Sequence, residues 1–211
     1  MKYISIMILA LTLSCNNAEQ KKSPAKSNTD NTTSNTANTK EADNNKEPKK
    51  ANGKKWNADA AKAQVKFSVS GPFGTVHGSL SGLKATIIFD KDDLASSSFD
   101  ASVDANSIST GISLRNSDLK KEKYLDADKY PSISYKSDKI SSSGNGYKAT
   151  GKLTIKGVSI EKEIPFSFSE TGNGGVFKGS FTIDRKEYGI GPSGGSIGST
   201  ITIDLEVPVT K

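Results

Sequence analysis

The stretch Ile201-Thr-Ile-Asp-Leu-Glu-Val-Pro-Val209 decides the fold, because an apolar residue occupies every second position along it. Alternation of this kind places one face of a β-strand on a core and the other face in water. The same pattern recurs upstream at residues 65–69, 85–89, 99–105, 133–135, 147–155, 164–168 and 177–183. Seven or eight such strands predict an all-β domain, built either as a sandwich or as a closed barrel.

Short turn signals separate the predicted strands, among them Gly71-Pro72-Phe73-Gly74 and Ser143-Gly144-Asn145-Gly146. Connections this short favour antiparallel neighbours, because parallel strands need long crossovers. Residues 111–130 lack the alternation and carry Leu114 and Leu119 among charges. They predict a short helix or a set of turns over one end of the sheet, which Pro131 ends.

The N-terminus predicts export. A basic start at Lys2, an apolar run from Tyr3 to Leu13 and the small Ser14 are typical of a signal peptide over residues 1–14. Thr12-Leu13-Ser14-Cys15 resembles a bacterial lipobox, although Thr12 replaces the usual leucine. Acylation of Cys15 would hold the chain to a membrane. We expect an exported, membrane-anchored lipoprotein of the bacterial cell envelope, in the periplasm or on the outer membrane; an ordinary secretory signal is the alternative.

Residues 15–55 are expected to form the lipidated cysteine and a disordered polar tether, and residues 56–211 the folded domain. Residues 16–55 contain no aromatic residue and no Val, Ile, Leu or Met. Such a segment buries too little apolar surface to become ordered. It also carries nine lysines against five acidic residues, whereas residues 56–211 are nearly balanced, with nineteen basic and eighteen acidic residues. Nucleic acid is therefore not an expected partner, since a nucleic-acid-binding domain concentrates positive charge on itself.

No catalytic residue, metal site or cofactor is predicted, and the protein is not expected to be an enzyme. Cys15 and His77 are the only cysteine and the only histidine, which leaves too few ligands for a zinc site or partners for a triad. Gly189 to Gly194 formally matches the dinucleotide-binding G-x-G-x-x-G pattern, but a strand rather than a helix follows it. We expect a mobile glycine-rich loop there.

Arg115 and Arg185 are the only two arginines, among twenty-seven lysines. Arginine is preferred where a planar fork makes several fixed hydrogen bonds, either within the domain or to an anionic head group. The structural role is favoured for Arg185, at a predicted strand end, and both roles stay open for Arg115. The segments around them, Ser113–Leu119 and Ile183–Ile190, are the most distinctive in the domain.

These two segments resemble motifs of the YceI-like family. Trp56-Asn57-Ala58-Asp59, Tyr130-Pro131-Ser132-Ile133-Ser134-Tyr135 and Gly151–Val158 also match, in the family's order, so that the resemblance covers Trp56 to the C-terminus. It implies a lipocalin-like, extended antiparallel β-barrel whose interior holds a polyisoprenoid or an isoprenoid quinone, in a family without established catalytic activity. Asn116 and Asp118 stand where members often carry Asp and His, which implies a different head-group preference.

A barrel of about eight strands either fills its interior with side chains or holds one small ligand. Small residues at inward-type positions favour a cavity, among them Ala101, Ala105, Ala149, Gly151 and Gly179. The predicted cavity-lining residues are Phe67, Phe99, Val103, Ile133, Leu153, Phe166, Phe181 and Ile203. The candidate head-group contacts are Arg115, Asp118 and Arg185.

The sequence thus predicts a lipid-anchored envelope protein that binds an isoprenoid lipid, for sequestration or transfer. The alternative is a non-catalytic envelope interaction module with a solid barrel core. The oligomeric state stays open.

Overall fold

The structure, a computed structural model, describes residues 53–211. The predictions for the signal peptide, for Cys15 and for most of the segment up to residue 55 lie outside these residues. Strands dominate the described chain, with one α-helix and one 3-10 helix between them. The elements are β1 (Lys55–Ala58), β2 (Gln64–Gly71), β3 (Gly74–Ile88), η1 (Leu94–Ser96), β4 (Ser98–Ser109), α1 (Ser113–Lys120), β5 (Ser132–Ser143), β6 (Gly146–Ile155), β7 (Val158–Thr171), β8 (Gly174–Asp184) and β9 (Thr200–Thr210).

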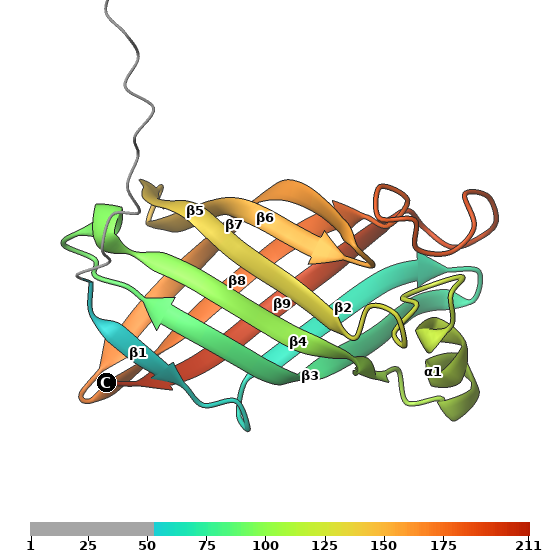
Figure 1. The fold of residues 1–211 in the computed structure, drawn as a ribbon, viewed down its shortest axis with the longest axis horizontal. Helices are drawn as coiled ribbons and strands as arrows, with labels where there is room; N and C mark the ends of the chain where they lie inside the picture. The colour runs from blue at the N-terminus through green and yellow to red at the C-terminus, as the bar shows by residue number, and fades with distance from the viewer. Residues whose placement is uncertain (1–52) are drawn as a thin grey trace, which may run out of the picture. The chain divides into compact units, whose positions relative to one another are not determined.

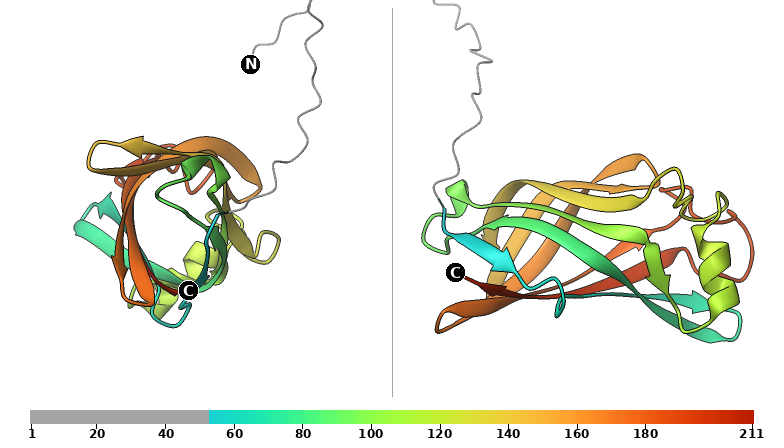
Figure 2. Two further views of the ribbon diagram at one scale, coloured as in Figure 1. Left: turned by 90° about the vertical axis from the view of Figure 1, so that its left-hand side faces the viewer. Right: turned by 60° about the horizontal axis from the view of Figure 1, so that its bottom comes forward.

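The strands form one antiparallel sheet that closes on itself. Their order is β1-β3-β2-β9-β8-β7-β6-β5-β4, and an additional β3–β4 pairing closes the barrel. β1 and β2 share one position in the wall, because both pair with β3 on one side and with β9 on the other. The end-on view in Figure 2 shows the closed ring of strands, and Figure 1 shows its elongation. The predicted all-β, lipocalin-like extended antiparallel barrel with a short helical insertion is confirmed.

One end of the barrel interior is filled by aromatic rings. Phe89 lies at the centre of this aromatic cluster, with its ring centroid 5.0 Å from that of Tyr147 and 5.3 Å from that of Phe177. Trp56 ties β1 to the cluster, because its indole Nε1 donates a hydrogen bond of 2.9 Å to the carbonyl of Phe89. Phe89 and Trp56 are almost fully buried. We call this the closed end.

The predicted insertion lies at the opposite end of the barrel. Figure 1 places α1, the β2–β3 turn and the loop between β8 and β9 together there, away from β1 and the C-terminus. The side-chain oxygen of Asn116 fixes α1 to the end of β4, since it accepts hydrogen bonds of 2.8 Å from both the backbone N–H and the hydroxyl of Thr110. The chain then makes turns up to Pro131 and enters β5. Within residues 53–211, no helix has the length and apolarity to cross a bilayer.

Candidate functional site

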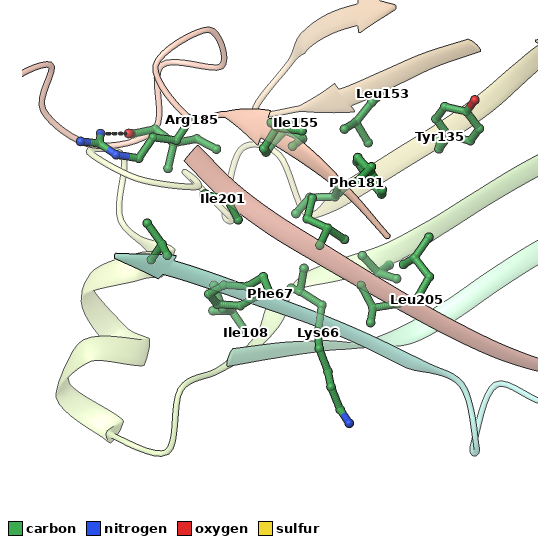
Figure 3. A pocket seen from close by; sticks show the side chains of 18 of the residues that line it. Lys66, Phe67, Ile108, Tyr135, Leu153, Ile155, Phe181, Arg185, Ile201 and Leu205 are labelled. Atoms are coloured by element: carbon green, nitrogen blue, oxygen red, sulfur yellow. Dashed lines mark hydrogen bonds between the residues drawn. The ribbon is translucent and has the colours of Figure 1, made fainter. Parts of the chain in front are cut away.

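A cavity of about 670 Å³ occupies the barrel between the closed end and α1. Strands from all around the barrel contribute to its wall, together with α1 and the β8–β9 loop. Aliphatic and aromatic side chains make up most of the lining, and Figure 3 shows Leu153, Phe181 and Leu205 among those that surround the space. By contrast, the charged end of Lys66 points away from it. The volume falls in the range of about 300–1,000 Å³ that is typical of small-molecule sites.

The structure brings together every side chain that the sequence predicts for the cavity wall. All eight line it: Phe67, Phe99, Val103, Ile133, Leu153, Phe166, Phe181 and Ile203. Phe67, Phe181 and Ile203 belong to three adjacent strands and remain only partly buried although they face inward. Inward apolar residues with residual exposure are the mark of a hollow interior, and this half of the barrel is at odds with a solid core. Their contact with a ligand stays a prediction.

The small residues at inward-type positions have two different roles. Ala101, Ala149 and Gly179 line the cavity, as the sequence suggests, whereas Ala105 is buried in the packed core and does not line it. Gly151, another glycine at an inward-type position, instead serves the wall itself. A Cβ there would lie 2.2 Å from the carbonyl oxygen of Lys136, next to the register shift between β5 and β6. Its small size therefore permits a close strand approach and adds no room for a ligand.

Arg185 holds the β8–β9 loop in place. Its side chain is only 3% exposed, and its guanidinium donates to the carbonyls of Ile190, Pro192, Ile197 and Gly198 at 2.7–3.1 Å. Four of the five guanidinium N–H groups are used in this way. Although Arg185 borders the cavity, this geometry makes it a structural anchor of the loop and leaves only one N–H group for a ligand's head group.

The same contacts correct the expectation of a mobile glycine-rich loop. Besides the four carbonyls held by Arg185, the backbone N–H of Gly191 donates to Lys123 and that of Gly198 donates to Ser70, each at 2.8 Å. The loop is thereby fixed to β2 and to the segment after α1. The glycines permit this path, since Gly189 and Gly191 adopt positive φ angles of 62° and 71°. β9 follows the loop, so the match to the dinucleotide pattern has no helix behind it.

Arg115 and Asp118 project from α1 at the mouth, where both line the cavity. Arg115 is half-buried and makes no hydrogen bond or ion pair with any residue of the described chain. Asp118 forms an ion pair of 2.7 Å with Lys121. Asn116, which like Asp118 departs from the family's usual residue, has its side-chain oxygen occupied by the hydrogen bonds from Thr110. Of the candidate head-group contacts, Arg115 is the one whose side chain remains available.

Tyr135 adds a polar atom to the apolar wall. It lies on β5 and lines the cavity, and its hydroxyl donates a long hydrogen bond of 3.4 Å to the carbonyl of Lys162. Burial, and secondarily the carboxylate of Asp138, raises its pKa far above the ordinary value, so the phenol stays neutral.

Sequence reasoning missed the lining residues that lie outside regular alternation. Leu80 and Leu83 lie on the stretch of β3 where the register shifts against β4. Ile190 and Ile197 belong to the glycine-rich loop, and Tyr124 follows α1. The only available signal was that each is apolar within a polar, glycine-rich or charged segment.

The described residues offer nothing that resembles a metal centre. Among residues 53–211 no three His, Cys, Asp or Glu side chains are grouped to hold a metal ion, and His77 is exposed on β3. What the arrangement provides is an apolar space with an unpaired guanidinium at its mouth. It is suited to a long apolar molecule with a polar or anionic end.

A closed antiparallel barrel with a hollow apolar interior defines a protein of the lipocalin-like fold class. More specifically, the chain belongs to the YceI-like family, whose domain model matches residues 56–209. A UPF0312 protein of Vibrio parahaemolyticus is 27% identical over 71% of this chain and 81% of its own length. A UPF0312 protein of Yersinia pestis is 23% identical over 64% of this chain and 73% of its own.

Solved structures share the fold. BcnA of Burkholderia cenocepacia has a TM-score of 0.70 and 25% identity, over 73% of this chain and 100% of that protein. The YceI protein of Campylobacter jejuni has a TM-score of 0.59 and 23% identity, over 64% and 85%. A polyisoprenoid-binding domain of Saccharophagus degradans, implicated in plant cell wall breakdown, has a TM-score of 0.58 and 14% identity, over 74% and 97%.

Proposed function

We propose that the barrel binds the apolar chain of a polyisoprenoid or an isoprenoid quinone, for sequestration or transfer at the cell envelope. The observation that carries this proposal is the apolar cavity of about 670 Å³ that opens beside Arg115, which has no partner among residues 53–211. The shared fold with a polyisoprenoid-binding domain supports the class of ligand. No cofactor and no catalytic step belong to the proposal.

The ligand enters end-on, with its tail toward the closed end and its polar end at the mouth. The rings of Phe99, Phe166 and Phe177 border the deep part of the cavity and belong to or pack against the buried aromatic cluster, so the chain stops there. Burial of the chain contributes roughly 25 cal/mol per Å² of apolar surface removed from water. Arg115 at the mouth then meets a phosphate or a quinone oxygen.

Lipid content tests the proposal directly. Organic extraction of the purified protein followed by mass spectrometry is expected to release an isoprenoid lipid. The emptied protein is expected to take up added ubiquinone-10 or undecaprenyl phosphate. Repeated absence of lipid, together with no uptake of either compound, would contradict it.

A pair of variants separates binding inside the barrel from adsorption to its surface. Ala101→Phe places a ring in the cavity, whereas Asp100→Phe places the same ring on the exposed outer face of the same strand. We expect the first variant to lose uptake at least about tenfold, because the space for the chain is filled, and the second to retain it. Equal uptake by both variants would place the lipid outside the cavity.

The proposal includes a lipid anchor at Cys15, which lies outside the described residues. Its support is the lipobox-like sequence that ends in the only cysteine. Anchoring keeps the barrel near the bilayer from which an isoprenoid is drawn. Cys15→Ser is expected to abolish incorporation of labelled fatty acid into the protein and to leave uptake of ubiquinone-10 intact. Incorporation of the label into Cys15→Ser would show that the anchor is elsewhere.

A further inference from the structure

The exposed apolar side chains of the barrel gather at its mouth. Within residues 53–211 the large apolar residues with high exposure are Phe73 at 102%, Leu114 at 75%, Ile112 at 49% and Val158 at 38%. Phe73 is at the tip of the β2–β3 turn, and Ile112 and Leu114 are at the start of α1; Figure 1 and Figure 2 place these two elements at the same end. The closed end has no comparable side chain among the described residues.

Three matching turns show that this distribution is specific to the mouth. The strand pairings Gly71↔Gly74, Ser143↔Gly146 and Thr171↔Gly174 each enclose a turn of two residues. The second turn residue is Asn145 or Asn173 in the latter two hairpins, but Phe73 in the β2–β3 hairpin. A fully exposed phenylalanine has no role in the barrel core, so its presence at this position points to an external contact.

The chemistry of the mouth fits a lipid surface. From residue 67 to residue 76 the hairpin tip carries no charged side chain. Arg115, unpaired within the described chain, lies beside it on the cavity rim. An uncharged apolar tip with an adjacent arginine matches the boundary between acyl chains and phosphate groups, where arginine stems are buried and their charged ends reach the head groups. A protein covering this end would close the cavity, whereas a bilayer surface also supplies its contents.

We propose that the mouth docks on a phospholipid bilayer through Phe73, Ile112 and Leu114, with Arg115 at the phosphate level, so that the ligand passes directly between the membrane and the barrel. This inference rests on the proposed function for its purpose, but the docking itself is measurable without any ligand. It predicts a fixed orientation, with the mouth toward the membrane and the closed end away from it.

Matched tryptophan reporters test the orientation. Phe73→Trp and Asn173→Trp occupy equivalent turn positions at the two ends, and the buried Trp56 gives the same background in both. Each is introduced into the full chain with Cys15→Ser, so that no acyl group holds it to the vesicles. With vesicles of phosphatidylethanolamine and phosphatidylglycerol that carry brominated acyl chains, we expect a blue shift and quenching for Phe73→Trp only. Quenching at neither position, at Asn173 alone or equally at both overturns the docking proposal.

A transfer assay tests the consequence for the ligand. The double variant Ile112→Ser/Leu114→Ser is expected to slow transfer of ubiquinone-10 from vesicles about tenfold, because two apolar contacts with the bilayer are lost. Its uptake of ubiquinone-10 from detergent micelles should equal that of the unsubstituted protein. Equal transfer rates from vesicles overturn the proposal, as does a mouth-to-mouth dimer that buries Phe73 in sedimentation and cross-linking experiments. If the unsubstituted protein takes up no lipid from either source, the proposed function fails, while quenching still decides the docking.

Discussion

The two arginines show how one residue type has two different roles in this barrel. Arg185 is buried and donates to four loop carbonyls, whereas Arg115 is half-buried and unpaired within the described chain. A lysine retains the charge but lacks the planar fork that reaches several carbonyls at once. The contrast between them is therefore open to direct measurement.

Arg185→Lys is expected to lower the free energy of unfolding by about 3 kcal/mol, because several buried carbonyls lose their donors. Urea denaturation followed by circular dichroism measures this change. The matched control Arg115→Lys is expected to stay within about 0.5 kcal/mol of the unsubstituted protein, as for an ordinary surface change. If both variants lost the same stability, Arg185 would not be the anchor of the β8–β9 loop.

Tyr188 presents the opposite case, a polar group without a partner. Its side chain is fully buried, and its hydroxyl forms no hydrogen bond with the described protein. Burial raises its pKa to about 12, with a smaller contribution from Glu187. The folded state thus favours the neutral phenol. Its contribution to stability is complete below about pH 10, the unfolded pKa, and is lost as the pH rises toward about 12.

Tyr188→Phe is expected to raise the free energy of unfolding by about 1 kcal/mol at neutral pH, because it removes an unsatisfied buried hydroxyl. It should also reduce the loss of stability between about pH 10 and pH 12, although not abolish it, since the raised pKa of Tyr135 acts in the same direction. Urea denaturation across this pH range checks both effects. A destabilised variant would mean that the hydroxyl has a hydrogen-bond partner after all.

At the scale of elements, the strands enclose an interior that is filled by aromatic rings at one end and hollow toward the other. Phe89 is 1% exposed, and its ring contacts five other aromatic rings, whereas Phe67 borders the cavity and is only partly buried. We expect Phe89→Ala to lower the free energy of unfolding by about 4 kcal/mol and Phe67→Ala by about 1 kcal/mol, because only the first opens a new hole in a packed core. Chemical denaturation of both variants checks this ratio. Similar losses would show that the mouth half is as tightly packed as the closed end.

Alternation in the sequence located the strands but not their lengths. The predicted strand at residues 85–89 covers only the last part of β3, which begins at Gly74 and ends at Ile88. Register shifts between Ser79 and Lys84 interrupt the period of two there, so the pattern could not be followed back through the glycines and serines. The serine-rich second half of β5 was likewise hidden, since its pairing with β6 depends on a partner strand rather than on its own apolar residues.

The candidate site was predictable where it depends on strand faces and not where it depends on loops. Phe67, Phe181 and Ile203 face the same interior because they are cross-strand partners or near neighbours, and alternation alone assigns that face. Alternation could not show which half of the barrel is hollow, since both halves share the pattern and differ only in how their side chains meet. The fixed β8–β9 loop depends on Arg185, whose four acceptors are backbone carbonyls that no side-chain pattern reveals.

For the whole molecule, stability and binding share the wall of the cavity. The aromatic cluster, the Trp56 contact to Phe89 and the closed ring of strands hold one end of the barrel, and a second buried cluster, which includes Ile108, Leu153 and Ile183, packs along the cavity. Apolar side chains around an unfilled space lack part of the packing that they would have in a solid core. A ligand chain supplies those missing contacts, so binding and stability should be linked.

This linkage gives a prediction for the intact protein. Added ubiquinone-10 is expected to raise the melting temperature of the emptied protein in a concentration-dependent manner. At a hundredfold excess over the dissociation constant, the gain in stability should be about 2.7 kcal/mol, because the ligand binds only the folded state. Ala101→Phe, whose ring takes the place of the chain, should melt at one temperature whatever the ligand concentration, whereas Asp100→Phe should respond as the unsubstituted protein does. Thermal melts followed by circular dichroism distinguish these outcomes, and a shift in Ala101→Phe as large as that in Asp100→Phe would move the binding site out of the barrel.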